Sequence, residues 1–299
     1  MAAYEARLPR REVRLRLRGM EHNVHEWGSP GGTPLVLLHG WMDTGATWQF
    51  LIDALNDGRH VLAPDWRGFG DSARADGGYW FPDYLADLDA LLDHYAPQEA
   101  VDMIGHSMGG NVAGLYAGVR PERVARLVQI EGFGLRPRPP SDAPERYRAW
   151  LDQLRESPTV STPASIEAFA ARLMERHPHL PADRADFVAR AWLRTGDNGR
   201  LQLRGDPAHK RANPVLYRLD EAEACWRRIT APALWIQGDS STALAHFGDA
   251  EELERRRSLY RDCELVCVAD AGHMVHHDQP AAVAAAVAAF FSRCRSRCA

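Results

Sequence analysis

Residues 101–117 of this chain read Val-Asp-Met-Ile-Gly-His-Ser-Met-Gly-Gly-Asn-Val-Ala-Gly-Leu-Tyr-Ala, and this stretch decides the fold. An apolar run leads into the G-x-S-x-G pentapeptide Gly105–Gly109, and a segment rich in small residues follows. The pattern predicts a strand, a sharp turn and a helix, in which the turn lifts the Ser107 hydroxyl above the edge of a sheet. A side chain at either glycine would collide with the neighbouring strand and helix, so the turn needs both glycines.

Alternating strand and helix patterns surround this turn. Two early segments, 12–18 and 22–27, alternate polar and apolar residues as half-buried strands do. Short, continuously apolar runs predict interior strands, and segments with helical spacing lie between most of them. This order predicts a mostly parallel sheet with helices on both faces. The interior strands are expected at 35–38, 60–63, 124–130, 233–236 and 265–268.

The alternation of strand and helix patterns is interrupted between residues 132 and 228. Prolines cluster at the start of this segment, and amphipathic helical patterns follow, with no convincing strand signal. We expect residues 1–131 and 229–299 to form the α/β core and residues 132–228 to form an all-helical lid. An insertion after the carboxyl end of a strand lies over the edge where open α/β sheets bind ligands.

Composition indicates an ordinary globular protein. The 299 residues are 45% hydrophobic and 25% charged, and the net charge of −4 argues against general nucleic-acid binding. No apolar targeting region is visible near the start, and the late apolar run 281–291 is too short to span a bilayer. The five cysteines do not suggest a disulfide framework. We expect a cytoplasmic monomer or homodimer that acts on a small molecule, without nucleic-acid or membrane partners.

A serine nucleophile requires a base, and the base requires an orienting acid. His273 follows the last predicted strand in a turn-rich segment and is the candidate base. The nearby His276 and His277 could suggest a metal cluster, but no carboxylate pattern supports one, so we expect no metal and no cofactor. The amide of Met108 is a candidate donor to an oxyanion, and Gly40 lets the chain turn so that the Trp41 amide is the second.

These pieces together resemble the α/β-hydrolase family. Their order matches the family from about residue 12 to residue 292, which implies the α/β-hydrolase fold and leaves the substrate open. The matching pieces are His39-Gly40-Trp41, residues 65–72 (Asp-Trp-Arg-Gly-Phe-Gly-Asp-Ser), Gly105–Gly109 and Gly272-His273.

The resemblance raises the question of which residue is the acid. In most of the family the acid follows the strand after the lid, where this chain has Ser241 or Thr242, and Asp239 stands too early. A minority of the family, including haloalkane dehalogenases, carries the acid after the strand that follows the elbow helix, and Glu131 occupies that place here. A carboxylate at the end of a buried strand is costly without a partner, such as a histidine. Glu131 is therefore the preferred acid and Asp239 the alternative.

The nucleophile narrows the chemistry that the resemblance implies. Dehalogenases and epoxide hydrolases of this fold use an aspartate where this chain has Ser107. We therefore expect a serine hydrolase that cleaves an ester or related acyl bond of a small, largely apolar molecule through an acyl-enzyme. Cofactor-free lyases and haloperoxidases on the same scaffold keep such a triad and remain alternatives, as does a ligand-binding protein without turnover.

Overall fold

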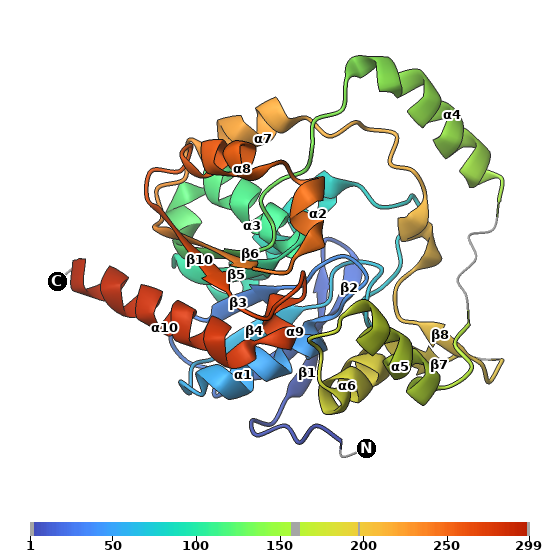
Figure 1. Ribbon diagram of the computed structural model, residues 1–299, viewed down its shortest axis with the longest axis horizontal. Helices are drawn as coiled ribbons and strands as arrows, with labels where there is room; N and C mark the ends of the chain where they lie inside the picture. The colour runs from blue at the N-terminus through green and yellow to red at the C-terminus, as the bar shows by residue number, and fades with distance from the viewer. Residues whose placement is uncertain (1–2, 157–161, 197, 298–299) are drawn as a thin grey trace.

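A computed structural model describes residues 3–156, 162–196 and 198–297, and its centre is one eight-stranded sheet (Figure 1). The strand order is β1-β2-β4-β3-β5-β6-β9-β10. The two pairings that involve β2 are antiparallel, and all the others are parallel. The strands are β1 Arg11–Leu17, β2 Met20–Trp27, β3 Leu35–Leu38, β4 Val61–Pro64, β5 Val101–His106, β6 Val124–Ile130, β9 Ala233–Gly238 and β10 Cys263–Val268.

Helices cover both faces of this sheet, because its central strands are apolar on both sides. One buried cluster joins α2, α3 and α7 to one face, and a second joins α1, α9 and α10 to the other. The expected α/β-hydrolase architecture is confirmed. The helices are α1 Gln49–Leu55, α2 Phe81–Tyr95, α3 Met108–Val119, α7 Leu219–Trp226, α8 Ala250–Arg257, α9 Val275–Asp278 and α10 Pro280–Arg297.

The insertion between β6 and β9 differs in one respect from the expected all-helical lid. It contains α4 (Ala143–Leu154), α5 (Ile166–Arg176) and α6 (Ala182–Trp192), but also an antiparallel hairpin of β7 (Leu193–Thr195) and β8 (Leu201–Leu203). The sequence pattern missed these strands because each has only three residues, too few to show an alternation.

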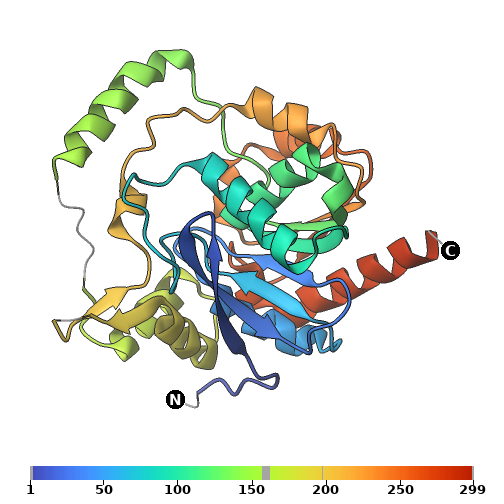
Figure 2. The same ribbon diagram turned by 180° about the vertical axis from the view of Figure 1, so that it is seen from behind.

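The parts of the insertion are anchored to different degrees. Helices α5 and α6 share a buried cluster with Phe50 of α1, whereas α7 packs in the main cluster beside α3. By contrast, α4 buries none of its residues, and it stands apart from the sheet at the rim of the molecule (Figure 2). Among the described residues, no helix combines the length and apolar character needed to cross a bilayer.

Candidate active site

The predicted turn at Ser107 has the strained backbone that its motif implies. Ser107 has φ 51° and ψ −115°, between the end of β5 and the start of α3. Its amide donates to the carbonyl oxygen of Ile130 at 2.8 Å, which ties the turn to the neighbouring strand β6. A Cβ on Gly109 would lie 2.1 Å from the carbonyl oxygen of Leu38, and one on Gly105 would lie 2.5 Å from that of Gly109. The two glycines are therefore required for close approach of the backbone, as the sequence suggested.

Glu131 directly follows the adjacent strand β6 and has a fully buried side chain. Its φ of 52° is unusual for a residue with a side chain and carries a strain of about 1–3 kcal/mol. Oε1 accepts a hydrogen bond from the Gly238 amide at 2.9 Å, and Oε2 accepts one from the Ser241 hydroxyl at 2.6 Å. Oε2 also lies 3.2 Å from Nδ1 of His273. Two donors and an imidazole thus surround this buried carboxylate.

The alternative acid, Asp239, lies in a different environment from Glu131. Asp239 is exposed, and its Oδ1 accepts from the Ser240 hydroxyl at 2.9 Å. Among the described residues, the ion-pair partner of Glu131 is His273. Sequence reasoning missed the role of Ser241. The usual position of the acid holds this serine, and its hydroxyl instead donates to Glu131.

His273 is held at its backbone as well as at its ring. Nε2 of His106, the residue before Ser107, lies 2.9 Å from the carbonyl oxygen of His273. His106 is buried, and this burial holds its pKa well below the usual range, so the ring is neutral. Among the described residues, no hydrogen bond joins the Ser107 hydroxyl to His273. Such contacts often tighten only when a substrate is bound.

The two predicted oxyanion donors lie beside the nucleophile. A Cβ on Gly40 would be 3.3 Å from Cβ of Ser107, so the loop after β3 contacts the turn directly. Met108 is the first residue of α3, and the first amides of a helix have no acceptor within the helix. Trp41 and Met108 both line one cavity of about 220 Å³. Trp41 is half exposed, which leaves the site open on this side.

A second group of titratable side chains lies behind this site. Ligand atoms of Asp43, His276 and His277 are within 4.8 Å of one another, and all three side chains are buried. Burial raises the pKa of Asp43 to about 6 and lowers that of His277 to about 3. These residues could hold a metal ion. The sequence argument against a metal cluster was therefore incomplete, because tertiary structure supplies a carboxylate from a distant loop.

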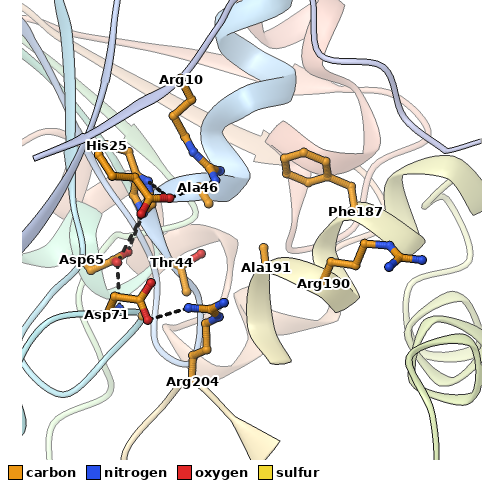
Figure 3. A pocket seen from close by; sticks show the side chains of 12 residues that line it. Arg10, His25, Thr44, Ala46, Asp65, Asp71, Phe187, Arg190, Ala191 and Arg204 are labelled. Carbon is orange, nitrogen blue, oxygen red and sulfur yellow. Dashed lines mark hydrogen bonds and ion pairs between the residues drawn. The ribbon is translucent and has the colours of Figure 1, made fainter. Parts of the chain in front are cut away.

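Two further cavities differ in character. The larger, of about 710 Å³, is lined mostly by apolar side chains, of which α2, α3 and α7 contribute part, and its lining also includes four arginines. Another, of about 210 Å³, lies between the core and α6 (Figure 3). Charged groups in this smaller cavity pair with one another, as His25 does with Asp65 and Arg204 with Asp71. Arg204 belongs to the insertion and Asp71 to the core, so this cavity lies where the insertion contacts the core.

Comparison with known proteins agrees with this fold. A family model described as the alpha/beta hydrolase fold matches residues 33–280. The chain belongs to the α/β-hydrolase-fold family. This α/β hydrolase is 30% identical over 258 residues to 2-(acetamidomethylene)succinate hydrolase of Mesorhizobium japonicum, a match that covers 86% of the chain and 87% of the relative.

Two other similarities are more limited. The serine hydrolase-like protein of Danio rerio is 31% identical over 180 residues, covering 58% of this α/β hydrolase but only 55% of the relative. The thioesterase domain from the curacin biosynthetic pathway superposes with a TM-score of 0.84, covering 94% of this chain and 99% of that domain. At 23% identity, this superposition shows the fold alone. The family and its relatives indicate a hydrolase.

Proposed function

We propose that this hydrolase cleaves an ester or related acyl bond through Ser107, His273 and Glu131. The observation that carries the proposal is the contact of 3.2 Å between His273 Nδ1 and a carboxylate that is entirely buried. A buried carboxylate favours the tautomer with a proton on Nδ1, which leaves Nε2 free to accept a proton. The same carboxylate stabilises the imidazolium that forms during turnover.

The reaction proceeds in two halves. Ser107 Oγ attacks the acyl carbon while His273 Nε2 takes its proton, and the imidazolium then protonates the leaving group. Water, activated by His273, attacks the acyl-enzyme and releases the acid and the free serine. The amides of Met108 and Trp41 donate to the oxyanion of each tetrahedral intermediate. The position of Met108 at the start of α3 adds the positive end of the helix dipole.

Several features support an acyl substrate rather than another class. The nucleophile is a serine, whereas an aspartate serves in the dehalogenases and epoxide hydrolases of this fold. The strained backbone of Ser107 and Glu131 is expected where a surrounding structure holds reacting groups in place. The apolar lining of the adjoining large cavity supports a largely apolar substrate.

The test is the hydrolysis of p-nitrophenyl acetate by the purified protein and by its Ser107→Ala variant. We expect loss of the nucleophile to lower kcat by about 10⁶, with an unchanged circular dichroism spectrum. As the matched control, Ser240→Ala removes an exposed serine hydroxyl beside Asp239 and should retain the wild-type rate. Retention of activity in Ser107→Ala would refute the proposal.

A further inference from the structure

The large apolar cavity follows one face of α3, the helix that begins beside the nucleophile. Asn111, Leu115 and Val119 line it, and Met108 lines the adjoining cavity that also contains Trp41. The spacing of three, four and four residues places these four side chains along a single face of the helix. The two cavities share Trp80, Phe81 and Asn213 as lining residues, so they adjoin one another.

Most of the side chains that line this cavity are apolar. Helix α2 contributes Phe81 and Leu85, and α7 contributes Ala222 and Trp226. Asn111 is the polar member of the α3 face, and its side-chain oxygen is already occupied by the Gly134 amide at 2.8 Å. At the far end, Val119 is 52% exposed, so the cavity opens to solvent there.

The length of the helix face sets the length of the ligand. Eleven residues separate Met108 from Val119, a distance of about 16 Å at about 1.5 Å per residue. An extended chain advances roughly 1.1–1.2 Å per bond, since one residue of three backbone bonds spans about 3.3–3.6 Å. The face therefore accommodates a linear chain of roughly fourteen bonds. A cavity of about 710 Å³ also lies within the range of about 300–1,000 Å³ that is common for small-molecule sites.

We propose that the substrate carries a linear acyl chain of roughly fourteen carbons, which lies along α3 from the oxyanion donors at Met108 to the opening at Val119. This inference rests on the proposed function and names the substrate class of that site. The cavity lining also includes Arg136, Arg138, Arg146 and Arg218 against the single acid Glu221, so an anionic ligand is not repelled.

The first test is a chain-length profile with p-nitrophenyl esters from acetyl to hexadecanoyl. The ratio kcat/KM should rise by up to about fourfold for each added methylene, up to about tetradecanoyl, and then level off as the chain reaches solvent. Leu115 lies seven residues beyond Met108, about 10 Å along the helix, so Leu115→Trp should move the optimum to octanoyl or shorter. Val119→Trp should lower kcat/KM only for the longest esters.

A matched control separates blockage from general damage. Glu122→Trp introduces the same indole at an exposed residue just beyond α3 and outside the cavity lining, and its profile should equal that of the wild type. Melting temperatures of all variants verify folding. If kcat/KM does not depend on chain length in the wild type, or if Leu115→Trp has the same optimum as the wild type, the proposed site for the acyl chain is refuted. Ser107-dependent hydrolysis of the acetyl ester would then still uphold the proposed function.

A binding measurement tests the proposed site for the acyl chain along α3 without turnover. We would titrate the Ser107→Ala protein with dodecanoate and with hexanoate and follow tryptophan fluorescence, since Trp80 and Trp226 line the cavity. We expect dodecanoate to bind at least tenfold more tightly, and this preference to disappear when Leu115→Trp is added. Equal affinity for the two acids would contradict the inference, even in a protein that hydrolyses no ester.

Discussion

The exchange of Glu131 for glutamine tests the proposed acid with almost no change in shape. The carboxylate accepts from the Gly238 amide and the Ser241 hydroxyl, and it faces His273 Nδ1. Because glutamine has one carbonyl oxygen and one NH₂ group, it cannot accept at both oxygen positions. If its carbonyl faces the Gly238 amide, the NH₂ group points at Nδ1 and favours the tautomer with a proton on Nε2. That tautomer cannot take the proton of Ser107.

The expected loss is large and falls on catalysis rather than on the fold. An amide in place of the triad acid lowers kcat by about 10⁴ in the serine proteases, which corresponds to ~5 kcal/mol of transition-state stabilisation. The imperfectly paired amide should cost the folded state about 1–3 kcal/mol. The exposed Asp239 serves as the matched control, because its carboxylate accepts from the Ser240 hydroxyl and the Ala271 amide and not from the ring of His273.

The assay compares kcat/KM for an activated ester, together with the melting temperature, in Glu131→Gln and Asp239→Asn. We expect the first variant to lose about four orders of magnitude and the second to stay within about twofold of the wild type. A Glu131→Gln protein within tenfold of wild-type activity would refute the reasoning. A greater loss in Asp239→Asn would transfer the role of the acid to that residue.

Three further predictions concern the frame around the site. Gly109→Ala forces a Cβ to within 2.1 Å of a backbone oxygen of β3 and should lower the free energy of unfolding by about 3 kcal/mol or more in urea titrations; an unchanged midpoint would contradict this. Ser241→Ala removes the 2.6 Å hydrogen bond to Glu131 and should reduce kcat about tenfold, while Ser240→Ala should not. Burial lowers the pKa of His39 to about 4 and that of His277 to about 3, so the unfolded chain binds more protons below pH ~6.5. The melting temperature should therefore fall as the pH is lowered from 6.5 to 4, although burial raises the pKa of Asp43 and this carboxyl contributes in the opposite direction. A melting temperature that rises over this range would contradict the lowered pKa values of the two histidines.

Much of the fold could be predicted because its signals are local. The run before Gly105 and the small residues after Gly109 specify a strand, a turn and a helix within seventeen residues, and the structure has β5 and α3 there. The requirement for Gly105 is also local, since a Cβ there would meet the backbone of Gly109, whereas the requirement for Gly109 arises from the distant strand β3. The hairpin of β7 and β8 escaped prediction because its three-residue strands are held by pairing rather than by a sequence pattern.

The candidate site was only partly predictable from the same signals. Ser107 and His273 stand in turns after strands, where the type of residue and its position suggest a role. The sequence favoured Glu131 over Asp239 but left both open, because each follows a strand and each is a carboxylate. The geometry separates them, since one is buried against His273 and the other is exposed.

By itself, the sequence determined the order of strands and helices, the strained serine turn and the residue types available for proton transfer, because periodicity and turn chemistry act over a few residues. Only the tertiary structure decided which distant groups meet. It placed Ser241 on the carboxylate of Glu131 and Asp43 beside His276, contacts that span 110 and 233 positions of the chain. Such contacts follow from the packing of parallel strands, whose carboxyl ends meet at one edge however far apart they lie in sequence.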